Sequence, residues 1–287
     1  MDHVAPDELV QSMLSSAEKK ANLSVKDLLI RSFLAGAILS FATSLAVIVL
    51  SQGLAPIVSA ILFPVGFVML VLLGLELATG NFAILPAGLA AGKLTFSKLL
   101  RNWAWVYAGN LAGSLFYAVL FYAAVTSLSS SPSGNLGDLF KAAAQKKTLG
   151  YAALGLRGWE TAFIKGILCN WMVTLGAVLA LVSRSTVGKI VAMWLPIFTF
   201  FAQGFEHSIV NMFVIPTGRM FGAPISLRQW WFWNQLPVTL GNIVAGALLT
   251  GLALYWTYKP KKTMEVRIET EISTAGEPVF ERVTTIG

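Results

Sequence analysis

A histidine lies inside a long apolar stretch of the chain, beside a glutamate and close to an asparagine. The three residues are His207, Glu206 and Asn211. Ionisable side chains are costly at membrane depth, and those found there usually serve transport or proton transfer. Imidazole changes its charge near neutral pH, so it is well suited to lend a proton to a passing weak acid and to recover it. We therefore interpret His207 as a group that takes part in transport or proton transfer.

A segment in the first half of the chain repeats the spacing around this histidine. Glu76 and Asn81 are separated as Glu206 and Asn211 are. Both glutamates have two interpretations that the residues leave open: they either cap broken helix ends or take part in anion passage. Lys165 either raises the local concentration of an anion beside the passage or reaches toward the membrane interface.

Metal and enzyme chemistry have little support in the sequence. Cys169 is the only cysteine, and His3 is the only histidine besides His207. Neither a carboxylate pair nor a cysteine cluster accompanies His207. We therefore expect no metal, no cofactor and no catalytic activity.

Long apolar segments must position these polar residues. The chain is 56% hydrophobic and only 12% charged, whereas soluble domains carry about a quarter charged residues. A helix needs about 20 apolar residues to cross about 30 Å of hydrocarbon. These figures predict an all-α membrane protein with six spans, of which the second and fifth are long enough to be interrupted: 28–51, 57–91, 102–128, 161–182, 190–216 and 236–258.

The distribution of basic residues predicts which side each end occupies. With six spans, both ends and two loops lie on one side, which carries Lys19, Lys20, Lys26, Arg31, Lys93, Lys98, Arg101, Arg184, Lys189, Lys259, Lys261, Lys262, Arg267 and Arg282. The opposite side carries only Lys141, Lys146, Lys147, Arg157, Arg219 and Arg228. The positive-inside rule therefore predicts two cytoplasmic termini. This topology explains the net charge of +7 without nucleic acid as a partner. The cluster of Trp230, Trp231 and Trp233 before the last span suits the membrane interface.

The layout indicates an internal duplication. Three spans, a polar loop and three further spans follow one another, and the middle member of each triplet is interrupted. An odd number of spans per repeat predicts an inverted 3+3 arrangement, which is typical of transporters with a substrate site near the midplane. The third span of each half carries Gly109-Asn110 or Gly241-Asn242, followed by small residues that allow close helix packing.

Two regions flank the predicted channel domain at 28–258. Residues 1–27 are predicted to form a cytoplasmic amphipathic helix, with Leu9, Val10, Met13, Leu14 and Ala17 on the face that meets the membrane surface or a neighbouring subunit. Residues 259–287 are predicted to be a cytoplasmic tail that forms a small hairpin around Gly276–Pro278 or stays disordered.

Four strings of residues carry a resemblance to a known family. They are Phe205-Glu-His-Ser-Ile-Val-Asn-Met-Phe213, Leu77-Ala-Thr-Gly-Asn81, Lys165-Gly-Ile-Leu-Cys-Asn-Trp171 and Pro237-Val-Thr-Leu-Gly-Asn242. Over about residues 7–258 the chain resembles the formate/nitrite transporter family, which includes formate, nitrite and hydrosulfide channels. The resemblance implies an aquaporin-like fold and a homopentamer in the inner membrane, surrounded by lipid, with one pore in each protomer.

The same resemblance implies roles for individual residues. It marks His207 as the central pore histidine, Thr79 as its partner and Asn170 as a pore-lining asparagine. It also implies an outer constriction formed by Phe63 and Phe200, and an inner one formed by Phe67, Leu77 and Val173. With Lys165 and Glu206 these residues make up the predicted passage for formate, nitrite or a similar small anion.

Several functions stay open at this point. A hydrosulfide channel and a proton-coupled secondary anion transporter fit the same scaffold. An aquaporin or glycerol facilitator shares the six spans and two half-helices, but its paired Asn-Pro-Ala signatures are absent from this sequence. The physiological anion, the direction of flux and any pH gating are not fixed by the residues. Formate is the favoured substrate because it is the commonest one in the family.

Overall fold

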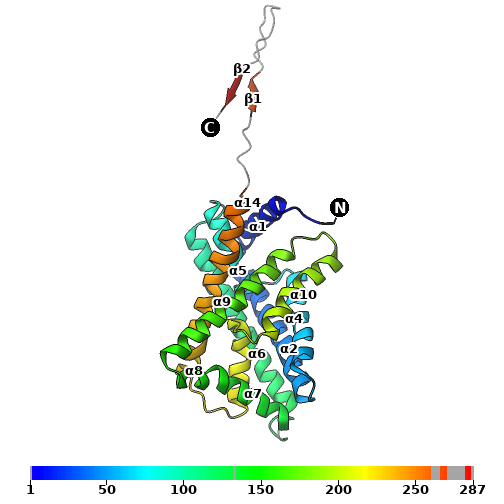
Figure 1. Ribbon diagram of the computed structural model, residues 1–287, viewed down its shortest axis with the longest axis vertical. Coiled ribbons are helices and arrows are strands. Elements are labelled where there is room, and N and C mark those ends of the chain that lie inside the picture. The colour runs from blue at the N-terminus through cyan, green and yellow to red at the C-terminus, as the bar shows by residue number, and fades with distance from the viewer. Residues whose placement is uncertain (1, 132–133, 260–265, 270–281, 286–287) are drawn as a thin grey trace, which may run out of the picture.

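The computed structural model describes residues 2–131, 134–259, 266–269 and 282–285. Its described residues form a body of packed helices, with both ends of that body on the same side in Figure 1. The strands β1 (Val266–Glu269) and β2 (Arg282–Thr285) pair antiparallel with Val266 opposite Thr285. Of the two alternatives expected for the tail, these paired strands correspond to the hairpin, whose expected turn at Gly276–Pro278 lies outside the described residues.

Four helical segments are long and apolar enough to cross a membrane. They are α2 (Val25–Ser51), α6 (Phe96–Val125), α9 (Leu156–Leu179) and the continuous run Leu227–Tyr258. The last segment consists of α12 (Leu227–Trp230), η1 (Trp231–Gln235), α13 (Leu236–Val244), η2 (Ala245–Leu252) and α14 (Ala253–Tyr258).

The helical run that contains the expected last span, 236–258, begins nine residues before it, at Leu227. Ser226 and Gln229 form a reciprocal capping box, which starts the helix at Leu227. The tryptophan cluster therefore lies within the first turns of the helix. Span one likewise begins at Val25, where Ser24 caps the backbone N–H of Asp27.

The two segments expected to be the second and fifth spans are each divided into separate helices. The second consists of α3 (Pro56–Leu62), α4 (Pro64–Leu72) and α5 (Ala78–Ala90). The fifth consists of α10 (Thr186–Ala202) and α11 (Ser208–Met220).

Both interruptions begin in the same way. Gly74 and Gly204 adopt left-handed φ values of 64° and 68°, which glycine reaches without a Cβ penalty. The next residue then donates its N–H five residues back, from Leu75 to Leu70 and from Phe205 to Phe200. This pairing is the Schellman ending of a helix.

Small residues bring the long helices into contact where the sequence predicted close packing. A Cβ at Gly113 on α6 would overlap the Phe33 carbonyl of α2. A Cβ at Gly241 on α13 would overlap the Phe163 carbonyl of α9. The hydrophobic effect does not drive helices together in lipid, because the acyl chains are as apolar as the side chains. Helix association therefore depends on close packing of this kind.

The first helix corrects one expectation. α1 (Pro6–Ala21) buries the predicted apolar face, but Val10, Met13 and Leu14 pack with Leu85 and other residues of α5 in the same chain. They do not lie on a membrane surface or a neighbouring subunit, because the second half-helix of the broken segment offers its own apolar side there.

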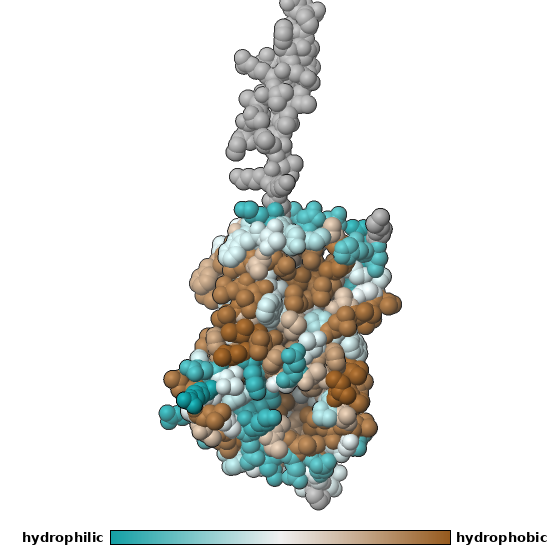
Figure 2. All heavy atoms as spheres, in the orientation of Figure 1, coloured by the Kyte–Doolittle hydropathy of each residue, from teal (hydrophilic) through white to brown (hydrophobic). Residues whose placement is uncertain are grey.

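The face of the helical body drawn in Figure 2 is largely apolar at mid-height. Figure 2 shows apolar side chains over the middle of this face and hydrophilic ones at its two ends. Large exposed hydrophobic residues include Phe41, Phe116, Leu195 and Trp256. Such a band fits a protein whose helices satisfy their own backbone groups in lipid. Between the two halves lie α7 (Gly134–Lys147) and α8 (Leu149–Ala153).

Candidate functional site

The half-helices α5 and α11 start from matching backbone positions. Leu77 and His207 are their N-cap residues, with φ and ψ of −113° and 121° in one and −110° and 120° in the other. The first helical N–H donates to an asparagine: Ala78 to Asn110 Oδ1 at 2.9 Å, and Ser208 to Asn242 Oδ1 at 3.0 Å.

The same two asparagines also hold the residue before each cap. Asn110 Nδ2 donates to the carbonyls of Glu76 and Ser32, and Asn242 Nδ2 to those of Glu206 and Gly166. Each asparagine thus satisfies backbone groups that the break exposes, which would be costly to leave unpaired in hydrocarbon. Both side-chain atoms of each asparagine are therefore hydrogen-bonded to backbone groups around the break.

His207 and Thr79 meet in the interior. His207 Nε2 lies 3.1 Å from Thr79 Oγ1, and His207 Nδ1 accepts the backbone N–H of Val210 at 3.2 Å. A backbone N–H can only donate, so Nδ1 carries no proton and the ring is neutral with its proton on Nε2. His207 is 3% exposed and Thr79 is 0% exposed. The imidazole therefore directs its only N–H toward Thr79.

Asn170 joins this pair from α9. Its Nδ2 donates to the Thr79 carbonyl at 3.1 Å and to the Asn242 carbonyl at 2.6 Å. Its Oδ1 is buried and has no hydrogen-bond partner within the described part of the chain. Three of the residues that the sequence singled out thus lie together.

Glu206 and Lys165 lie beside the histidine but make other contacts. Glu206 accepts from Lys147 Nζ at 2.7 Å, from Tyr151 Oη at 2.8 Å and from Asn211 Nδ2 at 2.8 Å. Lys165 accepts the Glu206 N–H with its carbonyl, and its ammonium lies 5.9 Å from the centroid of the Tyr151 ring.

The first half contains a twin of the Glu206 cluster. Glu76 accepts from Lys20 Nζ at 2.8 Å and from Asn81 Nδ2 at 2.7 Å. Asn81 donates to the side-chain oxygen of Asn102, and Asn102 Nδ2 donates to the Lys20 carbonyl. In the second half Asn211 donates to Asn234, which returns a bond to the Lys147 carbonyl.

Sequence reasoning missed Lys20, Lys147, Asn102 and Asn234 in these clusters. One signal was available, because Lys20 and Lys147 each end a Lys-Lys pair that precedes the first span of its half. The sequence does not show that these lysines reach the glutamates, since Lys20 is 56 residues from Glu76 and Lys147 is 59 from Glu206.

Aromatic residues flank the histidine. The Phe63 and Phe200 rings meet edge to face with centroids 5.8 Å apart, and the Phe200 ring lies 5.8 Å from the His207 ring at 24°. Phe67, Leu77 and Val173 are buried in the same core cluster as these two phenylalanines. The five residues expected to form constrictions thus belong to one apolar group.

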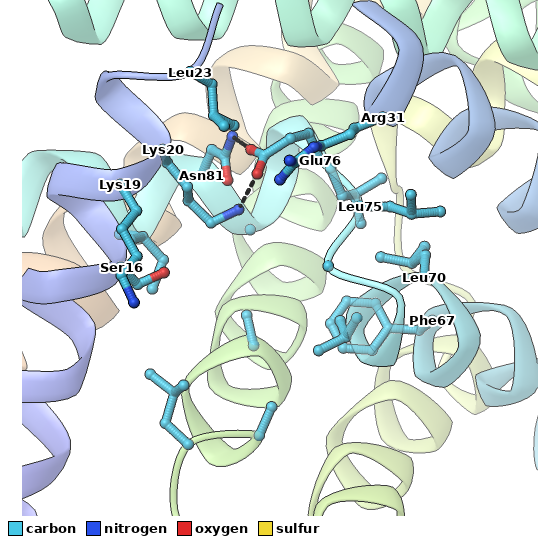
Figure 3. A pocket seen from close by; sticks show the side chains of 18 residues that line it. Ser16, Lys19, Lys20, Leu23, Arg31, Phe67, Leu70, Leu75, Glu76 and Asn81 are labelled. Carbon is cyan, nitrogen blue, oxygen red and sulfur yellow. Dashed lines mark hydrogen bonds and ion pairs between the residues drawn. The ribbon is translucent and has the colours of Figure 1, made fainter. Parts of the chain in front are cut away.

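A cavity of about 330 Å³ opens on the side of α1. Figure 3 shows its charged residues Lys19, Lys20, Arg31 and Glu76. Phe67, Leu77 and Gly80 also line it. The cavity therefore extends from basic residues at the end of α1 to two of the apolar residues expected to form the inner constriction.

The residues that the structure describes contain no group of three histidine, cysteine or acidic side chains that could hold a metal ion. Cys169 is free and buried. The site consists of hydrogen-bonding side chains, two ion pairs and aromatic rings.

Broken helices that end at buried polar groups define a class, the membrane transport proteins, whose substrate sites lie between such half-helices. A protein-family model described as "Formate/nitrite transporter" matches residues 7–256. The chain belongs to this family.

Individual relatives agree. A "Probable formate transporter" of Methanothermobacter thermautotrophicus is 36% identical over 269 residues, covering 88% of this chain and 97% of that protein. A solved "FNT family ion channel" is similar with a TM-score of 0.74 and 27% identity, covering 88% of this chain and 99% of that one. A "Pentameric formate channel with formate bound" follows with a TM-score of 0.64 and 26% identity, covering 82% and 97%.

Proposed function

We propose that this protein is a pH-sensitive channel or transporter that passes small monovalent weak-acid anions, formate or nitrite, with His207 mediating transient protonation. One observation carries the proposal: the neutral His207 directs its Nε2 proton toward Thr79, 3.1 Å away, inside an apolar enclosure. Formate is the preferred substrate because the relatives of this chain include a probable formate transporter and a formate channel.

The energetics favour passage in a neutral form. An unpaired charge at mid-membrane costs from a few to more than about ten kcal/mol. A weak acid with a pKa of about 4 is roughly three units from neutral pH, so protonating it costs about 4 kcal/mol at about 1.4 per unit. The apolar constrictions on either side of His207 would then admit the neutral acid and reject permanently charged ions. They consist of Phe63, Phe200, Phe67, Leu77 and Val173.

The hydrogen bonds suggest how the proton moves. Thr79 Oγ1 and His207 Nε2 would both face an anion that enters between them. The neutral ring can lend a proton only after it takes one up from the aqueous side at Nδ1, which makes it an imidazolium and costs the Val210 N–H bond. It then passes its Nε2 proton to the anion and is neutral again, and an anion beside the ring favours the charged form. Asn170 Oδ1, which is buried without a partner in the described residues, can accept a hydrogen bond from the protonated acid.

The matched clusters support the architecture. We propose six transmembrane helices in an inverted 3+3 repeat with broken second and fifth members, aquaporin-like, assembled as a homopentamer in the inner membrane. The termini would be cytoplasmic, by the distribution of lysine and arginine. The twin breaks, the twin asparagines and the twin glutamate clusters are the contacts expected of such a repeat. We propose no catalytic activity.

Uptake by proteoliposomes tests the function. We expect vesicles with the wild-type protein to accumulate labelled formate faster at pH 6 than at pH 8, and His207→Phe to lose most of this uptake. His3→Phe is the matched control, because His3 is exposed at the N-terminus. Undiminished uptake by His207→Phe would refute the role of the imidazole, while no uptake by the wild type would refute the function itself.

Two other functions of the family give different results in the same vesicles. A hydrosulfide channel would pass hydrosulfide and exclude formate and nitrite. A proton-coupled secondary transporter would show saturable, electrically silent uptake with a fixed number of protons per anion.

A further inference from the structure

Arg31 is a charged residue that neither the twin glutamate clusters nor the histidine site uses. It lies on α2 and lines the cavity beside α1. Figure 3 shows its side chain extending toward Glu76 and Leu75. Among the described residues, no hydrogen bond or ion pair involves its guanidinium. Lys20 is matched by Glu76, so Arg31 contributes a positive charge that the cavity wall does not balance.

The duplicated frame shows that this position is equivalent to that of Lys165. Asn110 donates to the carbonyl of Ser32, and Asn242 donates to that of Gly166. Arg31 precedes Ser32 as Lys165 precedes Gly166. The two halves thus place a cation at the same point of the frame, a guanidinium in one and an ammonium in the other. The ammonium lies over the Tyr151 ring, whereas the guanidinium faces the cavity.

The chemistry of the two cations differs. A guanidinium presents its N–H groups as a planar fork that bonds two oxygens at once, whereas an ammonium is a compact point charge. Formate and nitrite are both planar ions with two terminal oxygens. Hydrosulfide has one heavy atom and can occupy only one arm of the fork.

We propose that Arg31 is a specificity-determining anion-binding residue, which captures planar two-oxygen anions in the cavity before they pass Phe67 and Leu77. This inference rests on the proposed function and narrows its substrate class to small carboxylates and nitrite. Lys19 lines the same cavity and adds positive charge without the fork, so it attracts all anions alike.

The substitution Arg31→Lys separates shape from charge. Proteoliposomes would be assayed for the concentration of formate, nitrite or hydrosulfide at half-maximal uptake, after subtraction of protein-free vesicles. Losing a paired charge-assisted bond is expected to raise that concentration about tenfold for formate and nitrite. The value for hydrosulfide should change less than about twofold. Arg101→Lys is the matched control, because Arg101 bonds the Leu23 carbonyl and is not in the lining.

The outcomes separate the inference about Arg31 from the proposed function. Equal shifts for formate and hydrosulfide, or no shift for formate, would overturn the inference and leave the proposed function standing. No uptake of any anion by the wild type would overturn both. If Arg31→Lys does not fold, competition on the wild-type protein decides: nitrite should inhibit labelled formate uptake at concentrations where hydrosulfide does not, and equal inhibition would refute the inference.

Discussion

The ion pair between Lys147 and Glu206 allows a quantitative test of the frame. The two atoms are 2.7 Å apart, and the side chains are 21% and 4% exposed. Lys147→Met would leave a buried carboxylate without its cation, a change that costs about 3–5 kcal/mol in buried pairs. Because Tyr151 and Asn211 still donate to Glu206, we expect the lower end, about 3 kcal/mol of the free energy of unfolding.

A double-mutant cycle in detergent measures this coupling. Glu206→Gln keeps an acceptor for Tyr151 and removes the charge, so Lys147→Met with Glu206→Gln should destabilise the protein by less than the sum of the single changes. We expect a coupling of about 2 kcal/mol, since neighbours in one network commonly couple by 0.5–3. Additive effects within about 0.5 kcal/mol would refute the reasoning.

The twin pair supplies the comparison. Lys20 and Glu76 are 2.8 Å apart with exposures of 21% and 3%, so the same cycle there should give a similar coupling. If one ion pair showed a coupling free energy and the other did not, the two pairs would have the same geometry but different contributions to stability.

Two further predictions concern the loop at 183–185 and the helix contacts. Asp2 accepts hydrogen bonds from Ser183 and the following residues, which lower the pKa of its carboxyl below the usual 3.8. Its contribution to stability is therefore present above that value and is lost as the pH falls through the lowered pKa, so amide exchange of the 183–185 loop should rise below about pH 4, and Asp2→Asn should remove this dependence. Gly241→Ala should destabilise the protein strongly, because the new Cβ overlaps the Phe163 carbonyl, whereas Gly150→Ala should be tolerated with its nearest atom at 3.7 Å; equal melting temperatures would contradict this.

The sequence predicted the parts of the fold that depend on local composition. Apolar length marked the spans, and the excess length of 57–91 and 190–216 marked the two breaks, because a membrane-spanning helix has a fixed length. The small residues beside Asn110 and Asn242 marked the close contacts. These features follow from the lipid that surrounds the helices, so they can be predicted without knowing which residues contact one another in the fold.

The contacts that the sequence did not predict are long-range and polar. Composition shows that Glu76 and Glu206 need partners in the membrane, but many lysines could supply them. The choice of Lys20 and Lys147 depends on where α1 and α7 pack. The π-helical turns η1 and η2 were also unpredicted, since one extra residue in a helical turn leaves no clear change in an apolar pattern.

The frame is duplicated, but the chemistry within it is not. Leu77 and His207 occupy equivalent cap positions with nearly the same φ and ψ, yet only His207 has a ring nitrogen that accepts a helix N–H. Two residues after each cap, the first half has Thr79 and the second half has Ile209 at the equivalent position. The first half thus supplies a hydroxyl and the second an imidazole, and these meet at 3.1 Å. Had the halves stayed identical, either two imidazoles or none would lie at the centre. One polar pair between mirrored apolar walls gives the proposed passage a single point of proton exchange.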